Sequence, residues 1–176
     1  MEEILIRRAV GSDVERLVEL RLLLQQHAEE SSRSIWRITE EGKRLLKQKV
    51  VDDLAGSGGL VLVAEMGGKI IGFVHGEVIH RTDYLPRSVG SILTAYVARE
   101  FRRRGVGARL IEELCVFFNS EGVEDVTLRY VIGNREAEAF WKKLGFKPVI
   151  TSAKASLREL KSTLTTQDAE SPKDGC

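Results

Sequence analysis

The sequence has 176 residues, of which 43% are hydrophobic and 30% are charged, and its formal net charge is +1. This length fits a single domain with a full hydrophobic core, and the near-neutral charge argues against the broadly basic surface with which proteins grip nucleic acids. The longest apolar runs have only the length of a strand, so no transmembrane helix and no membrane partner are expected.

The N-terminal stretch Met1–Ile4 is acidic and then apolar, and it does not resemble a signal peptide. Ile4–Val10 alternates in polarity and is rich in β-branched residues, which predicts a strand. Gly11–Glu30 follows with apolar residues at helical spacing. Ser12 and Glu15 have the spacing of a capping box at the start of this helix.

A polar break over Ser31–Ile38 contains Trp36 and separates the first helix from a second one. The second helix is predicted over Thr39–Gly56. Thr39 stands where an N-cap is expected, and Gly56 stands near the expected end.

Two strands are then predicted over Leu60–Met66 and Lys69–His80. They are joined by Gly67-Gly68, which is a strong hairpin signal. A fourth strand is predicted over Val89–Ala98, and Gly90-Ser91 near its start indicates a bulge or bend.

The second half of the chain alternates helices and strands. Helices are predicted over Gly105–Asn119 and Asn134–Leu144, with a strand over Asp125–Ile132 between them. A last strand is expected from Phe146, resuming over Ala155–Leu160.

The tail over Lys161–Cys176 is rich in Ser, Thr and Asp and has no periodicity, so we expect it to be disordered. The folded domain is therefore expected over residues 3–160. The two cysteines, Cys115 and Cys176, form no cluster with histidines at metal-ligand spacing. A reducing, cytoplasmic setting without a bound metal is expected.

The predicted order of elements is β-α-α-β-β-β-α-β-α-β. Hairpins mixed with helical crossovers indicate a mixed α/β fold, with one mixed sheet and helices on both of its faces.

The start of the third helix is unusual, because Arg102–Arg104 precede it and no Asp, Glu, Ser, Thr or Asn stands there. The first N–H groups of a helix are unpaired and its dipole is positive at that end, so negative charge is preferred. A phosphate would suit this position, with Gly105 and Gly107 letting the backbone approach it and arginines adding contacts. The alternative is a solvated basic turn whose glycines shape a strand–helix junction.

Other phosphate motifs fit this turn less well. A P-loop needs Gly-Lys-Ser/Thr, whereas Gly107 is followed by Ala108-Arg109. A dinucleotide fingerprint needs a small residue where Leu110 stands and an acidic residue at the end of the next strand, whereas Asp125 stands at the start of that strand.

Arg102-x-x-Gly105-x-Gly107, placed directly after a strand that ends in Ala95–Val97, resembles the acetyl-CoA signature of the GNAT superfamily of N-acyltransferases. The helix and turn over Asn134–Phe146 are similar to that family's Asn-x-x-Ala-x-x-Phe-Tyr-x-x-x-Gly-Phe stretch. The resemblance extends over most of the chain, with the elements in the same order.

The resemblance implies that the fourth and fifth strands splay apart and that the pantetheine arm of acetyl-CoA lies between them. A backbone N–H of the fourth strand would then hold the thioester oxygen. N–H groups from Arg103 to Ala108 would cradle the pyrophosphate, and Arg102 and Arg104 would add charge. The implied cofactor-binding residues are Ala95, Tyr96, Val97, Arg102, Arg103, Arg104, Gly105, Val106, Gly107, Ala108 and Asn134.

The reaction implied by the resemblance is direct attack of a deprotonated substrate amine on the thioester. It needs positioning, an oxyanion donor and a base, and it needs no metal. The implied acceptor is a primary amine of a small molecule or a protein, and homodimers are common in the family.

Two departures from the family pattern concern the catalytic groups. Trp141 stands where many members have the tyrosine that protonates the leaving sulfur, and an indole N–H is not a usable acid, so we expect Trp141 to pack. The fourth strand has no carboxylate where some members carry a base. His75 and Glu77 share one face of the third strand by period-two spacing, and they are our candidate catalytic residues, with a buried structural histidine and a solvated glutamate as the alternatives. Trp36 is expected either in the acceptor pocket or as a plug against the sheet.

The sequence therefore predicts an N-acetyltransferase that moves acetyl from acetyl-CoA to a primary amine. The alternative is an acyl-CoA-binding regulatory module with little turnover, which the missing tyrosine and the missing carboxylate favour.

Overall fold

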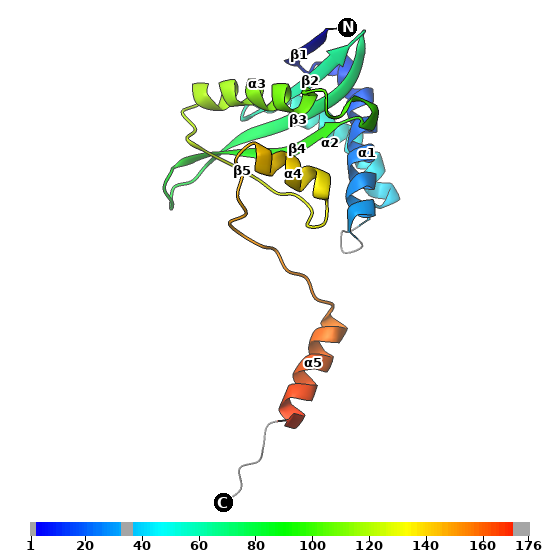
Figure 1. Ribbon diagram of the computed structural model, residues 1–176, viewed down its shortest axis with the longest axis vertical. Helices are drawn as coiled ribbons and strands as arrows, with labels where there is room; N and C mark the ends of the chain where they lie inside the picture. The colour runs from blue at the N-terminus through cyan, green and yellow to red at the C-terminus, as the bar shows by residue number, and fades with distance from the viewer. Residues whose placement is uncertain (1–2, 33–36, 171–176) are drawn as a thin grey trace, which may run out of the picture. The chain divides into compact units, whose positions relative to one another are not determined.

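The structure is a computed structural model that describes residues 3–32 and 37–170 (Figure 1). Its strands are β1 (Ile4–Arg8), β2 (Gly59–Met66), β3 (Lys69–His80), β4 (Ser88–Val97) and β5 (Asp125–Leu128). Its helices are α1 (Val14–Ser31), α2 (Glu40–Ala55), α3 (Val106–Ser120), α4 (Arg135–Lys143) and α5 (Leu157–Glu170), with short 3₁₀ helices at Gly11–Asp13 and Arg99–Phe101. The chain forms two compact units, residues 1–138 and residues 139–176. None of the described helices is both long enough and apolar enough to cross a membrane.

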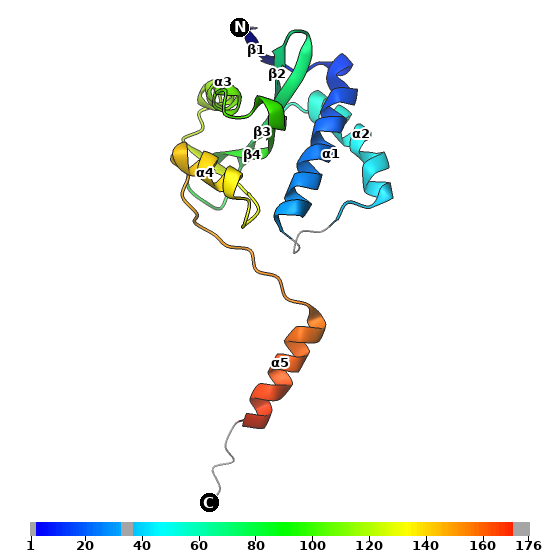
Figure 2. The same cartoon turned by 45° about the vertical axis from the view of Figure 1, so that its right-hand side comes forward.

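The five strands of the described chain form one sheet in the order β1-β2-β3-β4-β5. Neighbours from β1 to β4 pair antiparallel, and β4 pairs with β5 in parallel. Helices α1 and α2 lie on one face of this sheet and α3 lies on the other (Figure 2). The predicted mixed α/β fold with helices on both faces of one sheet is confirmed.

The β2–β3 hairpin forms where the glycine pair predicts it. Gly67 and Gly68 have φ angles of 57° and 74°, as a tight two-residue hairpin turn requires. The predicted N-cap of α2 is also present, because the Thr39 hydroxyl accepts a hydrogen bond from the Gly42 N–H at 3.0 Å.

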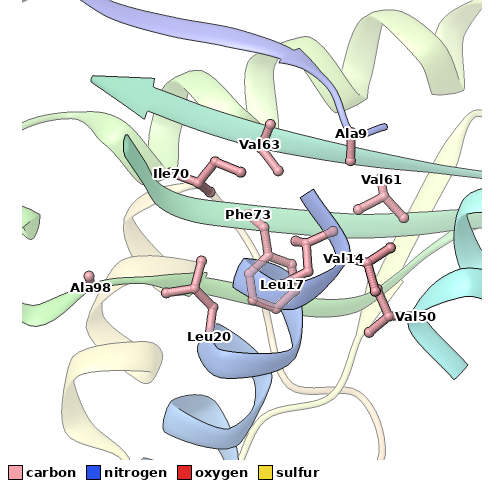
Figure 3. Packing of buried hydrophobic residues seen from close by; sticks show 10 residues of the cluster. All are labelled: Ala9, Val14, Leu17, Leu20, Val50, Val61, Val63, Ile70, Phe73 and Ala98. Atoms are coloured by element: carbon pink, nitrogen blue, oxygen red, sulfur yellow. The ribbon is translucent and has the colours of Figure 1, made fainter. Parts of the chain in front are cut away.

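A hydrophobic cluster fills the space between the sheet and the helices α1 and α2 (Figure 3). Its buried members are Ala9, Val14, Leu17, Leu20, Val50, Val61, Val63, Ile70, Phe73 and Ala98. Leu20 and Phe73 are fully buried, and burying a side chain of this size stabilises a fold by about 1.5–3 kcal/mol. This cluster fixes α1 against the strands that carry the candidate site.

Helix α3 packs closely on the opposite face because two strand residues there lack side chains. A Cβ atom at Gly76 would lie 2.8 Å from Leu114 Cδ2, and one at Gly90 would lie 3.0 Å from the Phe118 ring. These distances are shorter than van der Waals contact. A residue larger than glycine at either position would therefore prevent α3 from packing this close to the sheet.

The start of α1 differs from the capping box expected at Ser12 and Glu15. Asp13 organises this turn instead, since its Oδ2 accepts from the Val10 N–H at 2.8 Å and from Arg7 Nη1 at 2.7 Å. Its Oδ1 accepts from Arg7 Nη2 at 3.0 Å. The expectation was wrong because a local spacing rule cannot show that Arg7 of β1 faces this turn.

We expect Asp13→Asn to lower the free energy of unfolding by about 2–3 kcal/mol at neutral pH, because it removes the buried carboxylate partner of Arg7 and leaves the guanidinium only its ion pair with the more exposed Glu65. Arg7 holds the pKa of Asp13 below its ordinary value. The contribution of Asp13 is therefore present above the unfolded pKa of about 3.9 and is lost as pH falls through the lower folded pKa.

Urea unfolding of both proteins at pH 7 and at pH 3 measures this difference, which should be smaller at pH 3. Glu15→Gln is the matched control, because Glu15 is an exposed residue of the same helix and its loss should cost under about 1 kcal/mol. An Asp13→Asn effect of equal size at both pH values would contradict the assignment.

The C-terminal part of the chain contradicts two expectations. Residues 144–156 form neither helix nor strand, so the strand expected from Phe146 is not present. Helix α5 includes most of the strand expected over Ala155–Leu160 and extends into the tail that was expected to be disordered. A capping box begins α5, with the Ser156 Oγ accepting from the Glu159 N–H at 3.1 Å and Glu159 Oε2 accepting from the Ser156 N–H at 3.4 Å. The apolar side chains that follow have helical spacing and are Leu157, Leu160 and Leu164.

Candidate active site

Strand β4 contains a bulge at Leu93. Thr94 lies opposite His75 of β3 and Ile92 lies opposite Gly76, so Leu93 is an extra residue with no partner in the register. The bulge therefore lies further along the strand than the expected position at Gly90-Ser91. A bulge increases local twist and turns the strand away from its neighbour.

Pairing between β4 and β5 ends just before this bulge. The last pair in the register is Ile92 with Leu128, whereas β4 continues to Val97. From Leu93 onward, the side of β4 that faces away from β3 therefore has no strand beside it in the described sheet. We call the backbone of Leu93–Val97 on this side the open edge.

The hydrogen-bonding alternation of β4 shows which backbone groups lie on the open edge. The Ala98 N–H donates to the Ile71 carbonyl at 2.8 Å, so in an antiparallel ladder Tyr96 also pairs with Phe73 of β3. The N–H groups of Ala95 and Val97 consequently point to the open edge. The Tyr96 backbone points to β3, so of the three strand residues predicted to touch the cofactor only Ala95 and Val97 present free amides there.

The turn between β4 and α3 is shaped for an anion. Arg103 and Gly105 both have left-handed backbones, with φ angles of 61° and 80°. Left-handed residues next to right-handed ones gather successive N–H groups into a concave nest that binds anions. Helix α3 begins at Val106 with no side-chain cap and no acidic residue in its first turn, which leaves its N-terminal N–H groups available.

The three arginines of this turn have different surroundings. Arg103 and Arg104 are exposed, and the Arg104 guanidinium lies 5.6 Å from the centre of the Phe101 ring. Arg102 instead donates through Nε to the Val97 carbonyl at 3.0 Å and through Nη1 to Glu136. Sequence reasoning missed Glu136, and its only signal was an acidic residue in the first turn of a predicted helix.

Asn134 lies at the start of α4, where its Oδ1 accepts from the Ala137 N–H at 3.1 Å. The side-chain oxygen of Asn134 therefore caps the helix, and the side-chain amide nitrogen remains available to donate a hydrogen bond to a ligand. Trp141 in the same helix is buried and lies edge-on to the rings of Phe140 and Phe146. These contacts fit the packing role expected for Trp141.

His75 is buried and lies beside an ion pair of two half-buried residues, Arg21 of α1 and Asp53 of α2. Its Nδ1 is 3.4 Å from Arg21 Nη2 and 3.7 Å from Asp53 Oδ2, and Arg21 and Asp53 form an ion pair at 2.7 Å. Because arginine only donates, Nδ1 is an acceptor in this contact and the neutral ring carries its proton on Nε2. Burial lowers the pKa of His75 from its ordinary value of 6.5. His75 is therefore uncharged at neutral pH.

Two other groups lie near His75 on the same face of the sheet. Thr94, directly opposite on β4, has an Oγ1 that is buried and without a hydrogen-bond partner among the described residues. Glu77 is half-buried and lies opposite Ser91, further from the open edge. Trp36 lies outside the described residues. Within the described chain, no group of three or more His, Cys, Asp or Glu residues could hold a metal ion.

An anion attached to an extended chain that contains amides would be compatible with these features. The nest before α3 would hold the anion, and the Ala95 and Val97 N–H groups would donate to carbonyl oxygens of the chain. A mixed sheet that opens beside such a turn is the architecture of the N-acyltransferases that the sequence resembles. Residues 22–146 match the family described as Acetyltransferase (GNAT) family, and since this is more than half of the chain, the protein belongs to that family.

Individual relatives agree with this assignment. An uncharacterised N-acetyltransferase of Methanocaldococcus jannaschii is 33% identical over 85 residues, which are 48% of this chain and 38% of that protein. The chain thus matches well under half of the length of this relative.

Solved structures show the same fold. A tetramutant of a Bacillus halodurans protein superposes with a TM-score of 0.77 at 21% identity, over 87% of this chain and 99% of that chain. A GCN5-related N-acetyltransferase from Ralstonia eutropha gives 0.72 at 19% identity, over 88% and 99%. An aminoglycoside N-acetyltransferase in complex with CoA gives 0.68 at 16% identity, over 90% and 97%.

Proposed function

We propose that the protein transfers an acetyl group from acetyl-CoA to a primary amine of a small molecule or a protein. The observation that supports this most directly is the open edge of β4, where the N–H groups of Ala95 and Val97 face away from the sheet beside the nest before α3. Bound acetyl-CoA would supply the activated acyl group as a thioester. The near-neutral charge of the chain favours no class of acceptor by steering.

The chain's own residues would supply three functions. The Arg103–Ala108 backbone and the exposed arginines would hold the phosphates. The Ala95 N–H would stabilise the oxygen of the thioester carbonyl as negative charge develops on it, which typically contributes about 10²–10³ in rate for one such donor. A base would take the proton that an amine with a pKa near 10.4 carries at neutral pH.

We propose His75 as that base, acting through Thr94 and water rather than by direct contact. The neutral ring would accept the proton at Nδ1, its unprotonated nitrogen, in exchange for the contact with Arg21. Thr94 pairs with His75 in the register, and its hydroxyl has no hydrogen-bond partner among the described residues. A hydroxyl both donates and accepts, which a relay requires. Glu77 on the same face is the alternative base.

If His75 is the base, kcat/KM should fall on the acidic side with a midpoint below pH 6.5, because its pKa is lowered and the protonated ring cannot accept. His75→Gln should remove this acidic limb and lower the rate about a hundredfold, the low end for a general base. Glu77→Gln is the matched variant on the same face and should retain the limb. An unchanged limb in a folded His75→Gln protein would exclude His75.

The proposed function is tested by following release of the CoA thiol from acetyl-CoA in the presence of a panel of small amines, aminoglycosides and lysine peptides. We expect one class of amine to accelerate release well above the rate without acceptor. An acyl-CoA-binding regulatory module, the alternative function, would show a raised melting temperature with acetyl-CoA and no thiol release with any amine. The absence of a tyrosine at Trp141 and of a carboxylate on β4 is the observation that favours this alternative.

A further inference from the structure

Arg102, the first residue of the arginine turn, is held in place by the protein itself. Its Nε donates to the Val97 carbonyl at 3.0 Å, its Nη1 donates to Oε2 of Glu136, and its guanidinium carbon lies 5.4 Å from the centre of the Tyr96 ring. Only 21% of its side chain is exposed. A planar guanidinium with contacts on two edges and one face has a fixed orientation.

The carbonyl that Arg102 binds belongs to the open edge. Val97 turns its backbone groups away from β3, so a bond to its carbonyl sets the direction of the strand end that follows Ala95. Glu136 lies in the first turn of α4, and its Oε2 is also 3.8 Å from Nε2 of His27 on α1. Arg102 and Glu136 thus connect the end of β4 with α1 and the start of α4.

Arg102 differs in this respect from the other two arginines of the turn. Arg103 and Arg104 are exposed and form no ion pair with any residue in the described part of the chain. To reach a phosphate, Arg102 would have to leave both Val97 and Glu136. The carboxylate of Glu136 would also repel a phosphate that approached Arg102 where it stands.

We propose that Arg102 is a positioning residue, which fixes the open edge through the Val97 carbonyl and is itself fixed by Glu136, and that it does not bind the phosphates. The phosphate contacts belong to Arg103, Arg104 and the N–H groups of the nest. The consequence for the rate rests on the proposed acetyl transfer. This assignment replaces the phosphate role that the sequence motif implies for Arg102.

Two fragments of acetyl-CoA separate the two roles. The fragment 3′-phospho-ADP contains the phosphates without the arm, and acetyl-pantetheine contains the thioester arm without the nucleotide. Arg102→Lys keeps the positive charge but cannot bond both Val97 and Glu136 with one planar group. We expect this variant to bind 3′-phospho-ADP with a Kd within about twofold of the wild type, and to lose about 10- to 100-fold in kcat with acetyl-pantetheine, as misplacement of the reacting groups does.

Glu136→Gln and Arg104→Gln complete the comparison, with melting temperatures measured to show that each variant is folded. If Arg102 is a positioning residue, Glu136→Gln should lower kcat without changing the Kd for 3′-phospho-ADP. If Arg102 binds phosphate instead, Glu136 competes with the phosphate for it, and Glu136→Gln should lower that Kd. Arg104→Gln is the positive control for a lost phosphate contact and should raise that Kd about fivefold or more.

A Kd for 3′-phospho-ADP raised more than about fivefold in Arg102→Lys, or a wild-type kcat with acetyl-pantetheine in that variant, would overturn the positioning role. A wild-type protein that binds 3′-phospho-ADP but transfers acetyl from neither donor would instead overturn the proposed function. In that case the Kd of Arg102→Lys for 3′-phospho-ADP still decides whether Arg102 holds phosphate.

Discussion

Gly107→Glu is expected to weaken CoA binding about a thousandfold while the protein stays folded. Gly107 lies in the first turn of α3, where no side chain caps the N–H groups. A carboxylate there would add negative charge at the expected place of the pyrophosphate, and two like charges about 4 Å apart repel by about 4 kcal/mol at an effective dielectric constant of 20. This energy corresponds to about three powers of ten in Kd, which titration calorimetry measures directly.

The fold should tolerate this substitution for two reasons. Gly107 is not among the residues with a positive φ, and a glutamate in the first turn of a helix interacts favourably with the dipole, by about 0.3–1 kcal/mol. Gly107→Gln has the same bulk without the charge, so it should weaken CoA binding less than Gly107→Glu. Wild-type affinity in a folded Gly107→Glu protein would show that the phosphates lie elsewhere.

The arginine turn could be predicted from the sequence because its signal is local. Glycines, an uncapped helix start and excess positive charge stand within a few residues of one another, and the short-range rules for helix ends apply to them directly. The hairpin at Gly67-Gly68 and the N-cap at Thr39 were predictable for the same reason. The mixed sheet followed from the order of hairpins and helices.

Features that depend on distant partners could not be predicted in this way. Arg102 and Glu136 are 34 positions apart, and nothing in the motif distinguishes an arginine that binds a carbonyl from one that binds a phosphate. The Leu93 bulge depends on the register with β3, since an extra residue is visible only when both strands are aligned. The capping box at Ser156 is a local signal from which the start of α5 could have been predicted, but the β-branched and apolar residues before it suggested a strand.

Ala95→Pro is expected to lower kcat about 10²–10³-fold, the usual effect of removing one oxyanion donor, with little change in CoA affinity. The Ala95 N–H points to the open edge and pairs with neither neighbouring strand. Of the two donors on that edge, Ala95 is about 7 Å further than Val97 from the turn that would hold the phosphates, since a strand rises about 3.3 Å per residue. Ala95 therefore lies nearer to the thioester end of the arm.

Val97→Pro is the matched variant, because it removes the donor that is nearer to the turn. Val97→Pro should raise the Kd for CoA by a larger factor than it lowers kcat, whereas Ala95→Pro should mainly lower kcat. Tyr96→Pro between them removes an N–H that pairs with β3, so it should destabilise the fold through the lost ladder hydrogen bond, which would support the assigned alternation. Since proline also restricts φ, a second variant replaces Ala95 with lactic acid, which exchanges only the N–H for an ester oxygen. Wild-type kcat in this ester variant would mean that another group holds the thioester oxygen.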